Sequence, residues 1–129
     1  MEATGHNTPL SPAECRLLLR DHHLGRVAWQ SPAGIQVLPV SYVFIDNRIV
    51  LRTASGSLLS GLADPQPVGF EIDDLDAETQ TGWSVLVQGT SGPGEPAEGM
   101  LTEPWAPGDR PVVVAITPTE YSGRAIAAS

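Results

Sequence analysis

The residues best suited to chemistry stand in one short stretch, from 52 to 60, which reads RTASGSLLS. It follows an apolar, strand-like run and combines an arginine, several hydroxyls and the start of a predicted short helix. A guanidinium, hydroxyl donors and the free backbone N–H groups of a first helical turn can together hold a phosphate group. The same residues also suit a polar strand end and a serine-capped helix that binds nothing. Both interpretations stay open on this stretch alone.

Two other groups of titratable residues favour structural roles. His22 and His23 are adjacent at the end of a predicted helix, where neighbouring side chains do not face each other and cannot share one ion. A helix C-terminus also favours a protonated histidine without any ligand. The acidic run at 73–78 lacks the glycine and the spaced acceptors of a calcium loop, which indicates a solvated rim.

No familiar catalytic motif is present. The chain has no Gly-x-Ser-x-Gly elbow, no His-Glu-x-x-His pair and no Walker loop, so neither a hydrolase nor a nucleoside triphosphatase is supported. Lysine is absent, which removes Schiff-base mechanisms. The single cysteine, Cys15, excludes an intrachain disulfide and a thiolate metal cluster, and its leucine neighbours predict a packed thiol. We predict no metal site, and no acid or base stands out as catalytic.

Length and charge limit the remaining classes. The 129 residues suit one domain, which we place at 10–129 behind a polar, flexible tail at 1–9. A net charge of −8 argues against a nucleic-acid surface and against an anionic membrane. No apolar segment resembles a signal peptide or a membrane span, and we expect a cytoplasmic protein.

Local patterns predict a mainly β chain with short helices. Ser11, Pro12 and Glu14 form a capping box at the start of a helix that Gly25 would end. Short helices are also expected at 57–63 and 98–103. The expected strands are 26–29, 35–45, 48–53, 68–75, 83–90 and 111–117.

The connections between these strands favour an antiparallel barrel. Most are of hairpin length, and the crossover helices that parallel strands need are missing. Pro39 stands in the middle of the 35–45 strand, where it should interrupt the hydrogen-bond ladder or sit at a bulge. Such an interruption often marks a place where another group approaches the backbone.

Two tryptophans carry a further signal. Trp83 opens a predicted strand, and Trp105 lies between two prolines in a predicted loop. A loop tryptophan is costly to expose, so it is usually docked on its own barrel, on a partner subunit or on a ring-shaped ligand. All three possibilities stay open.

Six sequence blocks, taken in order, resemble the pyridoxamine 5′-phosphate oxidase-like flavin-binding proteins, and the likeness spans roughly residues 10 to 124. They are HHLGR within 20–28, LPVSY at 38–42, LRTASGS at 51–57, FEID at 70–73, TGWSV at 81–85 and PWAPG at 104–108. No single block is specific to the family, but six blocks in the same order make a chance resemblance unlikely.

The resemblance implies a split β-barrel homodimer that holds FMN, or in some relatives a deazaflavin or haem, in two grooves at the subunit interface. It implies three groups of site residues: Pro39, Val40 and Ser41 beside the isoalloxazine ring, Arg52, Thr53 and Ser57 around the phosphate, and Trp83 and Trp105 at the border, with Trp105 from the partner subunit. A small-molecule substrate would meet the ring there.

Two positions depart from the family pattern. Relatives commonly carry lysine where this chain has Leu58, and often arginine where it has Gln88. Loss of a cation that faces a phosphate removes on the order of 1.5–3 kcal/mol, or about one to two decades of affinity. The resemblance implies an FMN-dependent oxidoreductase, whereas Leu58 and Gln88 favour a non-enzymatic member of the family. The alternatives are a non-enzymatic sensor or carrier for a flavin, a deazaflavin or another ligand, and a structural dimer with an empty groove.

Overall fold

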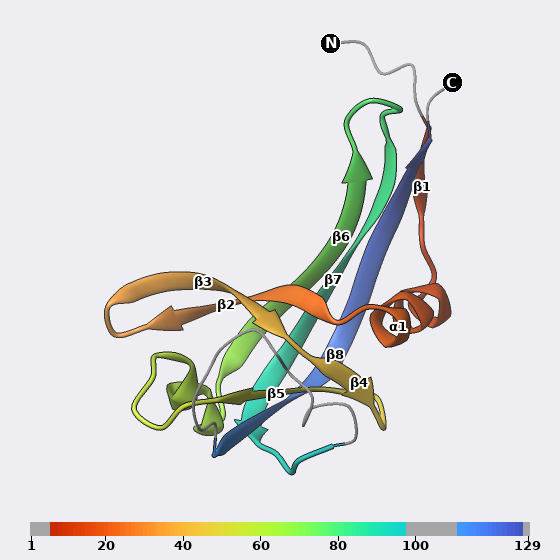
Figure 1. Cartoon of the computed structure of the whole chain (residues 1–129). Helices are drawn as coiled ribbons and strands as arrows, with labels where there is room; N and C mark the ends of the chain where they lie inside the picture. The colour runs from red at the N-terminus through yellow and green to blue at the C-terminus, as the bar shows by residue number, and fades with distance from the viewer. Residues whose placement is uncertain (1–5, 98–110, 128–129) are drawn as a thin grey trace.

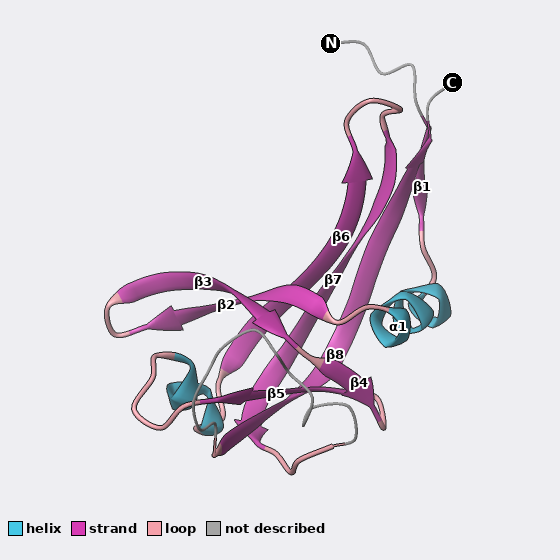
Figure 2. Ribbon diagram, in the orientation of Figure 1, coloured by secondary structure: helices cyan, strands magenta, loops and turns pink. Residues whose placement is uncertain are grey.

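The computed structural model describes residues 6–97 and 111–127, which form one antiparallel sheet with one α-helix and one 3-10 helix (Figures 1 and 2). The elements are β1 (His6–Pro9), α1 (Pro12–Asp21), β2 (Leu24–Ser31), β3 (Gly34–Ser41), β4 (Val43–Ile45), β5 (Arg48–Thr53), η1 (Leu59–Ala63), β6 (Pro67–Asp76), β7 (Thr81–Pro93) and β8 (Val112–Ala127). The helix expected at 98–103 and the loop that carries Trp105 lie outside the described residues.

The strand order shows how the sheet curls. It runs β3-β2-β6-β7-β8-β5-β4, and β1 adds to β8. The two end strands, β3 and β4, do not pair, yet they follow each other in the chain with only Tyr42 between them. The sheet must therefore curl until its two edges meet at Tyr42 without closing. This is a split barrel, as the sequence predicted.

The inward face of the curled sheet holds the core. Side chains alternate along each strand, and the inward set is apolar and buried. It includes Val27, Leu51, Phe70, Ile72, Val85, Val87, Val114 and Ile116. Helix α1 packs Cys15 and Leu19 against this core, and the structure confirms Cys15 as a buried, free thiol.

Helix α1 begins as predicted. The Ser11 hydroxyl accepts a hydrogen bond from the Glu14 N–H at 3.1 Å, and the Glu14 carboxylate accepts one from the Ser11 N–H at 2.7 Å. The role predicted for Gly25 is wrong, because the helix ends at Asp21 and Gly25 lies within β2. A Cβ at Gly25 would stand 2.5 Å from the Phe70 ring, so glycine is needed there for core packing.

The predicted 35–45 strand is broken at Tyr42, not at Pro39. Tyr42 turns inward, donates its hydroxyl to the Leu19 carbonyl at 2.8 Å and meets the Phe70 ring edge-on. Pro39 keeps an unbroken register opposite Arg26. The β2–β3 hairpin has a two-residue turn, and counting pairs from that turn makes Arg26 and Pro39 a non-hydrogen-bonded pair. The Pro39 nitrogen therefore faces the open edge of β3, and its missing N–H removes no hydrogen bond between β2 and β3.

The two ends of the chain pair with each other. His6–Pro9 form β1 and pair with residues 124–127 of β8, where we expected a flexible tail. Strand β8 extends to Ala127, well beyond the predicted end at 117. Its second half lies beyond the residues that pair with β5, and β1 runs alongside it there (Figure 1). Within the described part of the chain, no helix has the length and hydropathy to cross a bilayer.

Candidate functional site

Two hydroxyls meet at the end of β5. Thr53 is the last residue of the strand, is only 6% exposed, and its Oγ1 lies 2.7 Å from the Ser57 Oγ. Gly56, with φ of 76°, makes the turn between them. The Ser57 hydroxyl also accepts a hydrogen bond from the Ser60 N–H at 3.2 Å. The helix predicted at 57–63 is the 3-10 helix η1, which starts only at Leu59.

Backbone donors surround this pair. Among the described residues, the N–H groups of Ser55, Gly56 and Leu58 donate to no protein oxygen. Hydroxyls and free N–H groups on a tight turn are the donor set that phosphate oxygens accept from. The residues present therefore fit a phosphate group in their chemistry.

The Arg52 side chain leaves β5 on the face opposite to that of Thr53. Successive side chains on a strand alternate, so Arg52 points outward beside Val113, whereas Thr53 points toward the core. The sequence predicts all three of Arg52, Thr53 and Ser57 around one phosphate. The structure joins Thr53 and Ser57 by direct contact and places the Arg52 backbone next to them.

Residues 39–41, which the resemblance implies beside the ring, end the strand that precedes β4. The β4–β5 ladder runs from the pair Ile45–Arg48 to the pair Val43–Val50 and ends there, two residues before Arg52. Residues 39–41 pair with β2 instead. We call residues 39–41 of β3 together with Arg52 and Thr53 of β5 the split edges. The two segments are not paired with each other, and they contain five of the eight residues that the resemblance implies for the site.

Side-chain direction divides the β3 residues. Pro39 and Ser41 share the outward face, while Val40 points inward and is buried. A ligand at the split edges would therefore meet the backbone of all three residues but the side chains of only two. Leu58, in the turn after Ser57, is 47% exposed and does not pack inside the barrel.

Trp83 lies elsewhere in the same chain. It pairs with Ala125 of β8, whereas Arg52 pairs with Val113, about 40 Å away along the same strand. Its ring packs edge-on against His22 at 4.8 Å. The His22 Nδ1 lies 2.8 Å from the Leu18 carbonyl, so this histidine has the structural role that the sequence favoured. Trp105 lies outside the described residues.

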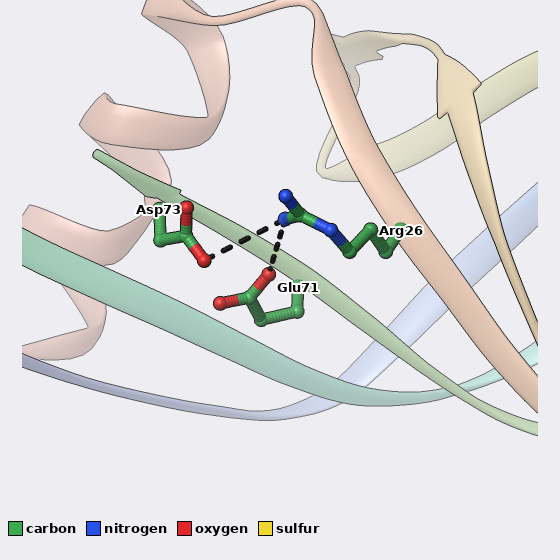
Figure 3. A network of polar contacts seen from close by, with 3 residues as sticks. All are labelled: Arg26, Glu71 and Asp73. Atoms are coloured by element: carbon green, nitrogen blue, oxygen red, sulfur yellow. Dashed lines mark hydrogen bonds and ion pairs between the residues drawn. The ribbon is translucent and has the colours of Figure 1, made fainter. Parts of the chain in front are cut away.

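An ionic network beside Pro39 escaped the sequence analysis. Arg26, the register partner of Pro39, lies 3.0 Å from a Glu71 oxygen and 3.5 Å from an Asp73 oxygen (Figure 3). Burial raises the pKa of the Glu71 carboxyl, the hydrogen bond and charge of Asp73 raise it further, and Arg26 opposes both. Asp73 is thus part of a network, not of a plain solvated rim. The period-two alternation of β2 and β6 indicates that these charged side chains lie on one face. Only the strand register shows that they stand close enough to pair.

Comparison with known proteins identifies the family. The family model for pyridoxamine 5′-phosphate oxidase matches residues 11–125. The chain belongs to this family. A curated family relative, the uncharacterized protein Rv0080 of Mycobacterium tuberculosis, is 35% identical over 123 residues, which cover 88% of this chain and 80% of the relative.

Solved structures share the family fold. The FAD binding protein of Mycobacterium smegmatis superposes with a TM-score of 0.73 at 29% identity, over 93% of this chain and 98% of that one. A FAD-binding protein of Mesorhizobium loti gives 0.78 at 20% identity, over 95% and 98%. These matches confirm the predicted fold class.

Proposed function

We propose that this protein binds a flavin at the split edges and acts, as a homodimer, as a flavin-dependent oxidoreductase on a small molecule. Family membership supports the proposal, and so does the FAD binding protein of Mycobacterium smegmatis, a structural neighbour at 29% identity. The observation that carries it is the Thr53–Ser57 hydroxyl pair at the end of β5, with the free backbone N–H groups of the turn beside it.

Each group at the split edges has a role in this proposal. Thr53, Ser57 and the N–H groups of the turn hold the phosphate, and Arg52 supplies the positive charge. The backbone of residues 39–41 lies against the ring, with Pro39 and Ser41 on its side of the strand. When bound, a flavin supplies hydride or electron transfer, and the protein supplies position and electrostatics.

The identity of the flavin is a separate question. The family resemblance implies FMN, with a deazaflavin as an alternative, and the Mycobacterium smegmatis neighbour is named for FAD. The absorbance spectrum of freshly purified protein, followed by titration with FMN, FAD and a deazaflavin, ranks the three. We expect FMN to bind, because the turn at 54–58 offers donors for a terminal phosphate.

Substitutions at the hydroxyl pair test the position. Thr53→Val and Ser57→Ala each remove one hydroxyl, and each should weaken flavin binding by about fivefold to tenfold. Arg52→Ala should weaken it by about 2 kcal/mol or more, since a charge-assisted pair is lost. Thr79→Val is the control, because Thr79 is an exposed hydroxyl in the turn between β6 and β7. Unchanged flavin affinity in all three site variants would show that the phosphate binds elsewhere.

A non-enzymatic flavin carrier is the second candidate. The exposed Leu58 favours it, because this position adds no positive charge for an anionic cofactor. The two candidates differ in turnover. Anaerobic mixing of the flavin-loaded protein with NADH or NADPH, followed by air, should give repeated flavin reduction and reoxidation for an oxidoreductase. A carrier should show neither step at a useful rate.

A further inference from the structure

The long strands β6, β7 and β8 pair side by side and run past α1 as one ribbon (Figure 1). Residues that stand opposite each other in neighbouring strands point to the same face of a sheet. On the outward face of this ribbon, three successive rows are Glu71 with Leu86 and Ser122, Asp73 with Ser84 and Arg124, and Leu75 with Gly82 and Ile126. We call these nine residues the β7 face, because β7 is its middle strand.

Exposed apolar side chains gather on this side of the sheet. Among the described residues, eight large hydrophobic side chains are exposed. Five of them lie on the outward side of β2, β3, β6 and β7, and they are Leu24, Ile35, Val37, Leu75 and Leu86. Exposed apolar groups that share one face are typical of an interaction surface.

The charges of the β7 face are divided between its two sides. Glu71 and Asp73, on β6, share the single guanidinium of Arg26 at 3.0 Å and 3.5 Å, which leaves an excess of one negative charge. Arg124, on β8, stands in the row of Asp73 with Ser84 between them, about 10 Å from it across two strand spacings. Arg124 is exposed and forms no ion pair with any described residue. The β6 side is therefore negative and the β8 side positive.

This division makes the face complementary to itself. A two-fold axis along β7 exchanges the β6 and β8 sides, so Asp73 lies over Arg124 of the partner subunit, and the reverse contact repeats it. The same axis sets the apolar Leu75 over the partner's Ile126. An axis across the strands would instead set Asp73 over the partner's Asp73, and like charges in an interface are unfavourable.

We propose that a second copy of this chain packs on the β7 face around a two-fold axis along β7, with two ion pairs between Asp73 and the partner's Arg124. Leu86 and Ser84 lie on the axis. Two sheets pack face to face about 10 Å apart, which brings opposing side chains into contact. The inference rests on the homodimer of the proposed function and names the surface that forms it.

Charge reversal tests the ion pairs, with sedimentation velocity over a dilution series as the measurement. Asp73→Arg and Arg124→Asp each replace two attractive contacts by two repulsive ones, and each should weaken the dimer by about a hundredfold or more. Asp74→Arg is the matched control. It makes the same charge change at an exposed position on the opposite face of β6, and the dimer should persist.

A mixture of the two reversed variants gives the sharpest result. In the mixed dimer, each chain supplies the charge that complements the reversed charge of the other, so both contacts are attractive again. Asp73→Arg and Arg124→Asp should each sediment near the 13.6 kDa of one chain when alone and form a dimer when mixed. Misfolding of a variant would not produce this recovery.

Leu86→Arg is an independent variant on the axis. It brings two guanidinium groups together across the interface, while Glu71, its cross-strand neighbour, can pair with the new cation within one chain and preserve the fold. We expect a monomer with the circular dichroism spectrum of the native protein.

The outcomes separate this surface from the homodimer itself. A native dimer whose affinity is unchanged in Asp73→Arg, Arg124→Asp and Leu86→Arg would reject the β7 face and leave the homodimer in place. Folded, monomeric Asp73→Arg and Arg124→Asp that stay monomeric when mixed would also reject the β7 face. A native protein that is monomeric throughout the dilution series would reject both the surface and the homodimer.

Discussion

Thr53 and Ser57 are four residues apart and act as one unit only because Gly56 folds the chain back between them. Their hydroxyls lie 2.7 Å apart, and the next residue, Leu58, is exposed at the rim of the same turn. A side chain added at position 58 would therefore reach solvent and any phosphate at the turn. It would not be driven into the core.

Leu58→Lys should for this reason increase flavin affinity without a loss of stability. A lysine at this position adds a cation next to the hydroxyl pair, and we expect binding to tighten by about tenfold at low salt, with a smaller gain as the ionic strength rises. Fluorescence titration at two salt concentrations together with a melting curve measures both effects. A lower melting temperature with unchanged flavin affinity would show that position 58 does not face the cofactor.

Glu71 gives a pH prediction at the same scale. Burial and Asp73 raise the pKa of the Glu71 carboxyl above its ordinary value, so the folded chain holds this proton more tightly than the unfolded chain does. The stability that Glu71 contributes is complete below its unfolded pKa and is lost as the pH rises through the raised, folded pKa.

The Glu71→Gln variant has no titratable group at position 71. The melting temperature of this variant relative to the native chain should therefore rise between about pH 4 and about pH 7. Glu78→Gln, in the exposed turn after β6, is the control for a general charge effect. A constant difference for Glu71→Gln across this range would mean that Arg26 cancels the effect of Asp73.

At the scale of elements, the packing of β2 against β6 depends on Gly25. The Phe70 ring and the Glu71 carbonyl occupy the space that a side chain at this position would take. Gly69, one strand away, has no such neighbour. The two glycines thus provide a matched pair for the same substitution.

Gly25→Ala should destabilise the fold by about 1–3 kcal/mol, because the added methyl group overpacks the core. Gly69→Ala should change stability by less than about 0.5 kcal/mol, as is usual for an uncrowded surface position. Urea unfolding of both variants measures the difference. Equal effects would contradict the close contact between Gly25 and Phe70.

At the scale of the whole molecule, apolar side chains remain uncovered on the outward side of β3. Ile35 is 75% exposed and Val37 57%, and both lie on the same face of this edge strand. Neighbouring apolar groups of this size are typical of an interface. We expect a homodimer that covers them.

Val37→Glu should dissociate this dimer, because it places a charge within the apolar contact. Light scattering at micromolar concentration should give a mass near the 13.6 kDa of one chain for the variant and twice that for the native protein. Leu17→Glu, at an exposed position on α1, is the control and should stay dimeric. A native protein of single-chain mass would reject the dimer.

The sequence by itself determined the parts of this protein that depend on neighbours in the chain. The capping box of α1 and most of the strands followed from local pattern, because helix caps and period-two alternation act over a few residues. The family resemblance carried the split-barrel fold, which the strand order and the solved neighbours confirm.

Only the tertiary structure decided which residues meet. Register brought Arg26 to Glu71 and Asp73, and it placed Trp83 far along β8 from the split edges. It also decided the roles of Gly25 and Pro39, which local rules assigned to a helix end and to a strand break. Strand pairing joins residues that are distant in the chain, and a shift of one residue would turn every side chain to the other face. Local alternation indicates which side chains of one strand share a face, but it does not say which residues of a distant strand stand opposite them.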